Sequence, residues 1–188
     1  MQDKNDQVIA RLQKLSKFKE MGIEAYPHSF KRTHDSAKLK EEKDSLMASE
    51  REISFAGRVV RFNRKGKVCF MHLKDRYGRL QVVCARDLVG EENYEVVKLI
   101  DLGDFVGVTG VMFETQTGEY SVKVSSVTML SKAVRPLPTT KKKIDENGNK
   151  IVFNEFADVD TRYRQRYTDM ALNDDVKDVF VKRAKIMQ

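Results

Sequence analysis

An aromatic ring and a side-chain amide occupy outward-facing positions on two neighbouring predicted strands. In residues 68–74 the apolar side chains alternate along the chain, which leaves Phe70 on the opposite face with His72. In residues 79–85 the same alternation turns Gln81 outward. A flat ring can stack on an unpaired nucleic-acid base while an amide hydrogen-bonds to the edge of that base. The alternative interpretation is that Phe70 packs beneath a loop or a second domain, because small sheets often have both faces partly covered.

Basic side chains crowd the segment around these strands. Between Phe55 and Asp75 there is no acidic residue, whereas six residues are Arg or Lys. This pattern favours a rim that binds phosphates, and the alternative is a solvated turn that keeps the sheet soluble. Glu119 or Ser121 can add a polar contact from the last predicted strand. The candidate nucleic-acid-binding residues are therefore Phe70, Gln81, Arg58, Arg61, Arg64, Lys67, His72 and Glu119.

The composition agrees with a polyanionic partner. The chain has 188 residues, a formal net charge of +7 and 34% charged residues, which favours nucleic acid or an anionic membrane surface. No apolar run approaches the roughly 18 residues that a membrane span needs, and no secretory signal is visible, so we expect a cytoplasmic protein.

The sequence predicts no catalytic chemistry of its own. His, Cys, Asp and Glu show no metal-ligand spacing, and neither a Gly-rich phosphate loop nor a nucleophile motif is present. Cys69 and Cys84 fall on the core faces of their strands, where reduced thiols are expected. We therefore expect a binding module with no catalytic residue, no metal and no cofactor in this chain.

The elements that must position the candidate residues are mainly strands. Apolar spacing predicts a helix over 6–21 and a weaker, highly charged helix over 36–47. Five strands follow, with a short helix over about 92–100 between the third and fourth: 53–62, 68–74, 79–85, 104–113 and 120–130. This is the order of an OB-fold barrel, and the interposed helix argues against an SH3-like barrel. The predicted class is α+β, mainly β, with an amino-terminal helical extension and a carboxy-terminal linker and helix.

Composition shifts divide the chain into four parts. The helical extension covers 1–50, the OB-fold domain 51–132, a linker 133–172 and a final helix 173–188. Within the linker, 141–153 is expected to form a hairpin that turns at Asn147-Gly148. The final helix, capped by Asn173-Asp174-Asp175, has no stop signal before Gln188, so a fragment of a longer protein is expected.

The run Arg162-Tyr163-Arg164-Gln165-Arg166-Tyr167 alternates arginine with tyrosine or glutamine. Such a run can contact RNA through its guanidinium groups and rings. It can equally form an interdomain clamp, in which the arginines bond to acidic groups of a neighbouring domain.

Short motifs along the chain are similar to those of a known family. Arg135-Pro136-Leu137-Pro138 follows the predicted barrel, and the run 162–167 with Asp169 resembles the entry to a catalytic domain. The same family has similar motifs at three further places in this chain: residues 101–104, residues 115–119, and Met21-Gly22 before Tyr26-Pro27. The chain resembles, over nearly its whole length, the amino-terminal anticodon-binding region of bacterial-type class II lysyl-tRNA synthetases, truncated at the start of the catalytic domain.

The resemblance implies that the barrel binds the anticodon of lysine tRNA. In this subclass a strand aromatic stacks on the central anticodon uridine and a glutamine on the next strand reads its edge, and these roles fall on Phe70 and Gln81. Relatives often carry adjacent arginines where this chain has Phe62-Asn63, so the contact with the base passes to Arg61 or Arg64.

The resemblance also implies what the intact protein does. Residues 176–188 resemble the start of the motif 1 helix, which forms the dimer interface of a homodimer. The intact ligase would attach lysine to its tRNA through a lysyl-adenylate, using ATP and magnesium in the missing catalytic domain.

Two other hypotheses remain open. A free-standing OB-fold protein that binds single-stranded nucleic acid without catalysis would show little base preference and a strong salt dependence. A structural module that binds a partner through its opening helix would show no RNA affinity at low salt.

Overall fold

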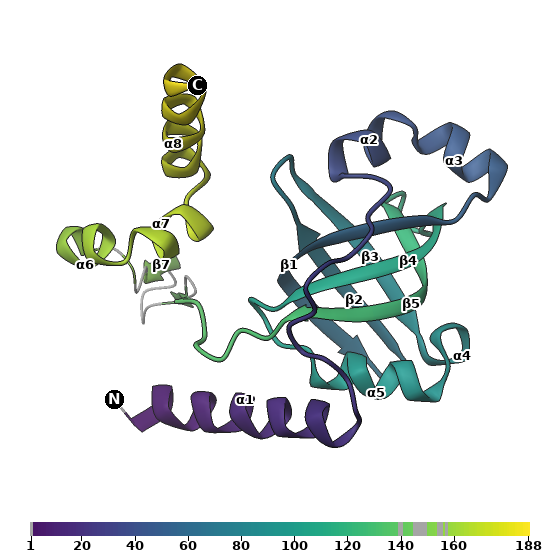
Figure 1. Cartoon of the computed structure of the whole chain (residues 1–188), viewed down its shortest axis with the longest axis horizontal. Helices are drawn as coiled ribbons and strands as arrows, with labels where there is room; N and C mark the ends of the chain where they lie inside the picture. Colours follow the sequence, from purple (N-terminus) through teal and green to yellow (C-terminus); the bar gives the residue numbers. More distant parts are fainter. Residues whose placement is uncertain (1, 139–140, 145–149, 154–155, 157) are drawn as a thin grey trace. The chain divides into compact units, whose positions relative to one another are not determined.

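The computed structural model describes residues 2–138, 141–144, 150–153, 156 and 158–188 (Figure 1). Two compact units follow one another along the chain, Met1–Pro136 and Leu137–Gln188. The first unit contains a closed sheet of five strands, and the second contains a two-stranded sheet followed by helices.

The closed sheet has the strand order β1-β2-β3-β5-β4. Its strands are β1 (Ile53–Lys65), β2 (Val68–Lys74), β3 (Arg79–Ala85), β4 (Phe105–Glu114) and β5 (Tyr120–Ser131). β3 and β5 pair in parallel, whereas the other neighbours are antiparallel. Two short helices, α4 (Arg86–Val89) and α5 (Glu91–Leu99), lie between β3 and β4. This arrangement confirms the predicted mainly β fold and is consistent with an OB-fold, although α4 was not predicted.

The amino-terminal extension holds α1 (Gln2–Glu20), α2 (Ser36–Glu41) and α3 (Lys43–Ser49). The prediction of one helix over 36–47 is wrong, because two helices meet at Glu42. The Asp35 carboxylate caps α2 by accepting bonds from the backbone N–H groups of Ala37 and Lys38. Within the first unit, α2 and α3 cover one end of the closed sheet and α4 and α5 the other (Figure 1).

One extra residue interrupts the first strand of the sheet. Val59 pairs with Leu73 and Arg61 pairs with His72, so Val60 has no partner on β2. Such a β-bulge shifts the alternation of side chains by one residue. Val59 faces the core before the bulge, and Phe62 packs against the core after it. The odd-numbered residues that follow Val60 therefore turn to the outer face.

Two thiols face each other inside the barrel. Cys69 on β2 is the direct partner of Cys84 on β3, and both are buried and free. Burial raises the pKa of the Cys69 thiol to about 12 and also raises that of Cys84, so both stay protonated and unreactive.

A buried ion pair lies at the end of the barrel where β5 finishes. The side chains of Lys132 and Asp104 are both 0% exposed, and their Nζ and Oδ2 atoms lie 2.7 Å apart. Lys132 also donates to Asp101 Oδ2 at 2.6 Å and to the backbone carbonyl of Leu99 at 2.9 Å. The Asp104 carboxylate further accepts bonds from the backbone N–H groups of Asp101 and Ala133. Each buried charge is thus fully hydrogen-bonded.

The same cluster holds the first helix. From α1, Lys14 Nζ donates to Asp101 Oδ1 at 2.5 Å, and Arg11 donates to the backbone carbonyls of Leu102 and Ala133. Phe18 on the same helix is 0% exposed. Burial alone would raise the pKa of Asp101, but the hydrogen bonds from Lys132 and Lys14 outweigh it and hold that pKa below its ordinary value.

The second unit begins with the predicted hairpin. β6 (Lys141–Ile144) pairs antiparallel with β7 (Lys150–Phe153), while the predicted turn at Asn147-Gly148 lies outside the described residues. Three helices follow: α6 (Val159–Arg164), α7 (Arg166–Leu172) and α8 (Asp174–Met187).

The arginine run forms a clamp around an acid of its own segment. The Asp169 side chain is 0% exposed and accepts bonds from Arg162 Nε at 3.1 Å, Arg166 Nη1 at 2.8 Å and Asn173 Nδ2 at 2.6 Å. For these two arginines the bonded acid is therefore local and does not belong to a neighbouring domain. Asn173 is the N-cap residue of α8, as predicted, but its side chain donates to this carboxylate and makes no cap hydrogen bond to the helix.

We expect Lys132→Met to destabilise the first unit by about 3–5 kcal/mol, because it leaves the Asp104 carboxylate buried without its cation. Urea unfolding followed by circular dichroism measures the loss. Lys123→Met, at an exposed position of the same strand, is the control and should change the unfolding free energy by no more than about 0.5 kcal/mol. Equal effects of the two variants would contradict a structural role for the pair.

Asp75 should make stability depend on pH. Its Oδ1 accepts bonds from the N–H groups of Tyr77 and Gly78 and from Ser36 Oγ, and its Oδ2 accepts the Ser36 N–H at 2.8 Å. Burial alone would raise the pKa of Asp75, but these bonds hold it below its ordinary value. The carboxylate therefore stabilises the fold fully above the unfolded pKa of about 3.9, and this contribution is lost as the pH falls through the lower folded pKa.

Asp75→Asn should accordingly lower the free energy of unfolding by about 1–3 kcal/mol at pH 7. In either orientation of the new amide, its NH₂ group would face a backbone N–H donor. The difference from the unaltered protein should shrink as the pH is lowered from 5 toward 2 in a series of urea unfolding curves. A difference that stays constant over this range would show that the charge of Asp75 contributes nothing.

Candidate nucleic-acid interface

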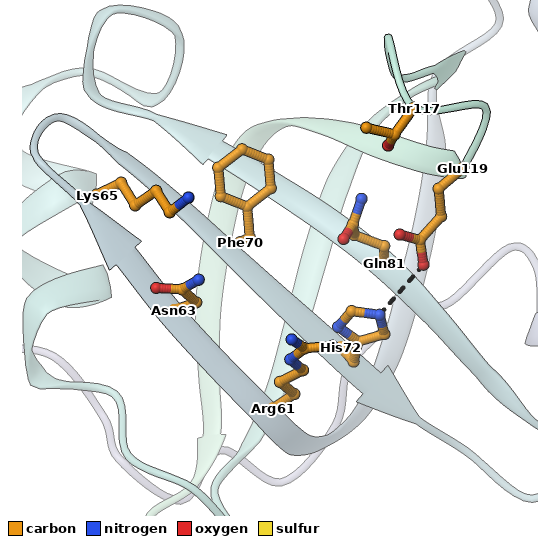
Figure 2. Close-up of a pocket in the computed structure, with 8 residues that line it drawn as sticks. All are labelled: Arg61, Asn63, Lys65, Phe70, His72, Gln81, Thr117 and Glu119. Carbon is orange, nitrogen blue, oxygen red and sulfur yellow. Dashed lines mark hydrogen bonds and ion pairs between the residues drawn. The ribbon is translucent and has the colours of Figure 1, made fainter.

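An open groove of about 370 Å³ lies on the outer face of β1, β2 and β3 and beneath the turn that joins β4 to β5 (Figure 2). Eight side chains line it: Arg61, Asn63, Lys65, Phe70, His72, Gln81, Thr117 and Glu119. Five of these residues are among the eight candidates from the sequence, and they come from four different elements.

Strand register brings the ring and the amide to one surface. Asn63 on β1 is the direct partner of Phe70 on β2, and His72 on β2 is the direct partner of Gln81 on β3. Figure 2 shows the amide of Gln81 between the ring of Phe70 and the carboxylate of Glu119. The outward orientation that strand alternation predicted for Phe70, His72 and Gln81 is therefore present, and the Phe70 ring is only partly buried.

The Gln81 amide is held by neighbouring protein groups. The residue is only 8% exposed, and its Nε2 donates to Ser121 Oγ at 2.9 Å. Ser121 is 0% exposed, and its hydroxyl donates to the backbone carbonyl of Glu119 at 3.2 Å. Ser121 thus lies below the groove and does not line it, so the polar contact predicted from the last strand stays a prediction for Glu119.

An acid and an imidazole close one side of the groove. His72 Nε2 lies 3.2 Å from Glu119 Oε1. The turn places Glu119: its N–H donates to Thr115 Oγ1, its carbonyl accepts the Thr115 N–H, and Gly118 takes a left-handed φ of 78°. A carboxylate at this side would repel a phosphate, so an anionic backbone fits better along the opposite side.

The opposite side is basic because of the bulge at Val60. Arg61 and Lys65 follow the bulge on β1, and both line the groove. If β1 alternated without interruption from Val59 through Val60, these odd-numbered side chains would point toward the core. The bulge therefore places on the outer face the two basic side chains that can bind a phosphate.

Three predicted basic residues lie elsewhere. Arg58 donates from Nη1 to the Gly103 carbonyl at 3.3 Å, and its guanidinium lies 4.3 Å from the centre of the Phe105 ring. Burial lowers the pKa of this guanidinium. Arg64 pairs with Cys69, a core position, and Lys67 belongs to the turn before β2. None of the three lines the groove.

The sequence analysis missed Asn63 and Thr117, and it predicted Lys65 only as one of the six basic residues of the phosphate-binding rim. Asn63 and Lys65 lie beyond the end predicted for the first strand, and no residue type near Val60 signals a bulge. Thr117 is in a turn that was recognised, but its approach to the groove depends on the β4–β5 pairing.

The arrangement suits an unpaired nucleotide. A base can stack on Phe70 with its edge toward Gln81, while its phosphates lie near Arg61 and Lys65. Among the described residues, no cluster of three or more His, Cys, Asp or Glu side chains is suited to a metal ion. In the same part of the chain, no helix is long and apolar enough to span a membrane.

Arg61→Ala should weaken binding of a single-stranded homopolymer such as poly(U) and lower the slope of log K against log salt by about 0.7, the value for one lost phosphate contact. Arg58→Ala is the matched control and should leave the slope unchanged, because that guanidinium donates to the Gly103 carbonyl and lies over the Phe105 ring. Fluorescence anisotropy between 50 and 200 mM salt measures both variants. A larger slope change for Arg58 would contradict this placement of the phosphates.

Comparison with known proteins identifies the domain. Residues 53–130 match the family model tRNA_anti-codon, described as an OB-fold nucleic acid binding domain. The chain is 41% identical over 192 residues to the lysine--tRNA ligase of Enterococcus faecalis and, over the same length, to that of Streptococcus pneumoniae. It is 40% identical over 194 residues to the lysine--tRNA ligase of Staphylococcus epidermidis.

These alignments include 100% of the chain but only 36% to 37% of each relative, so the chain spans little more than a third of their length. The barrel, its outer groove and the full-length similarity agree with one another. Residues 53–130 are thus similar to an OB-fold nucleic acid binding domain, and the chain as a whole is similar to the amino-terminal part of lysine--tRNA ligases.

Proposed function

We propose that the groove binds the anticodon loop of a tRNA and is the anticodon-recognition site of a lysyl-tRNA synthetase. The observation that carries the proposal is the placement of Phe70 and Gln81 side by side on the outer face of the matched domain. An anticodon loop presents unpaired bases, and these are the nucleic-acid elements that proteins read by stacking and by hydrogen bonds to base edges.

Phe70 supplies the stacking surface. Its ring is partly exposed in the groove, so a base that covers it removes apolar surface from water on both partners. Stacking of this kind contributes about 1–3 kcal/mol for each base and does not depend strongly on base identity. The ring therefore provides affinity, and the choice of base falls to the polar groups.

Gln81 supplies the contact with the base edge. Its amide lies next to the ring on the adjacent strand and carries both a donor and an acceptor. For a lysine tRNA the base that stacks on Phe70 is the central anticodon uridine. Glu119, at the far side of Gln81, is then suited to a donor on a neighbouring base, since its carboxylate only accepts hydrogen bonds.

Arg61 and Lys65 supply the electrostatic contribution. Their charges lie on the side of the groove away from Glu119, and the chain as a whole carries a formal net charge of +7. A positive field of this kind raises the rate at which a polyanion meets the protein. It adds affinity for any RNA, so base preference must be measured at moderate salt.

The proposal extends to the intact protein. As a lysine--tRNA ligase, it would join lysine to its tRNA through a lysyl-adenylate, with ATP and magnesium bound by a catalytic domain. It would act as a homodimer in the cytoplasm. No described residue is assigned to ATP, magnesium or the aminoacylation chemistry, and the role of this chain is to select the tRNA.

The test compares two RNA hairpins that differ only in the central base of the loop, UUU and UCU. The unaltered chain should prefer UUU at moderate salt. Phe70→Ala should weaken UUU binding by about 5- to 150-fold, the equivalent of 1–3 kcal/mol. Tyr77→Ala, which removes a ring 57% exposed on the β2–β3 turn, is the control and should change binding less than twofold.

Equal and salt-sensitive binding of both hairpins would refute anticodon reading and favour a nonspecific single-strand surface. No binding at low salt would refute RNA recognition by this groove altogether.

A further inference from the structure

The buried hydroxyl of Ser121 lies beneath the residue that reads the base. We propose that Ser121 is a positioning residue that fixes the orientation of the Gln81 amide and thereby determines which pyrimidine the groove accepts. The inference rests on the proposed function, because it assigns base selectivity to a group within the same site.

Two hydrogen bonds define the orientation. Ser121 Oγ donates its single proton to the Glu119 carbonyl at 3.2 Å and accepts a proton from Gln81 Nε2 at 2.9 Å. The nitrogen of the amide therefore faces β5, and the oxygen faces the groove (Figure 2). The reverse orientation would place an oxygen against Ser121 Oγ, which requires the hydroxyl to give up its bond to Glu119.

Burial makes this arrangement effective. Gln81 is 8% exposed and Ser121 is 0% exposed, so water competes poorly for either group. The parallel pairing of β3 with β5 sets Gln81 directly opposite Ser121, which fixes the distance between their backbones. At this separation the Ser121 hydroxyl is within hydrogen-bond distance of the Gln81 amide. Ser121 itself does not line the groove.

A fixed amide distinguishes the two pyrimidines. Next to each other, uracil presents the N3–H donor and the O4 acceptor, whereas cytosine presents an N3 acceptor and an N4–H₂ donor. An amide held in one orientation presents its acceptor and its remaining N–H donor in a fixed arrangement. It can therefore hydrogen-bond to one pyrimidine, whereas with the other it places donor against donor and acceptor against acceptor. An amide that is free to rotate by 180° matches either.

The experiment measures binding of the UUU and UCU hairpins to the chain and its Ser121→Ala variant. Loss of the hydroxyl should lower the preference for UUU at least fivefold, in part because UCU binds more tightly than it does to the unaltered chain. Ser126→Ala, at an exposed position of the same strand, should leave the preference unchanged. Thermal unfolding of each variant confirms that the barrel is intact.

A double-mutant cycle separates positioning from a general structural effect. If Ser121 acts through Gln81, Ser121→Ala should not change the ratio of the two affinities once Gln81 is alanine. The inference would be overturned if Ser121→Ala kept the full preference for UUU over UCU. It would also be overturned if Ser121→Ala lowered the affinity for both hairpins equally and did so again in the Gln81→Ala background. In either case the proposed function would stand, because the unaltered chain would still prefer UUU. An unaltered chain with no preference would overturn both.

Discussion

The buried pair of Asp104 and Lys132 is the interaction on which the rest of the first unit depends. Two charges removed from water are tolerated only when their remaining hydrogen-bonding groups are satisfied. Here the partners come from the end of α5, the loop before β4, the chain after β5 and, through Asp101, from Lys14 on α1. All of these segments must therefore be in place for the buried charges to be hydrogen-bonded. One end of the barrel and the first helix are thus joined by a single electrostatic arrangement.

A closed barrel leaves only its outer surface for binding, and the strands divide that surface into regions of different chemistry. β2 brings the ring, β3 the amide, the β4–β5 turn a carboxylate and the far end of β1 two cations. Stacking, hydrogen bonding and charge are thus presented side by side by rigid elements. Ser121 supports this surface from below without lining it. Residues that bind and residues that position are contributed by paired strands, so the geometry of the groove follows from strand register.

Much of this could be predicted from the sequence. Alternation of apolar residues gives β2 and β3 with their correct bounds and places Phe70 and Gln81 on the outer face. Local pattern fails where tertiary contacts decide. The bulge at Val60 has no residue signature, so the outward turn of Asn63 and Lys65 was not foreseen. Arg58 has the same residue type and charge as Arg61, yet the nearby Gly103 carbonyl and Phe105 ring hold it elsewhere. The same limit applies to Gln81, whose burial depends on a strand 40 residues away in sequence.

The bulge also shows that a binding surface depends on residue count as well as residue identity. Val59 and Phe62 are three positions apart in the sequence, yet both face the core, because Val60 is an extra residue with no partner on β2. Uninterrupted alternation from Val59 would instead direct Arg61, Asn63 and Lys65 toward the core. A homologue without the extra residue keeps the same outer surface only if the counterparts of Val59 and Phe62 are two positions apart. An alignment of relatives therefore has to allow for one residue more or less in β1 before the residues at Arg61 and Lys65 are compared.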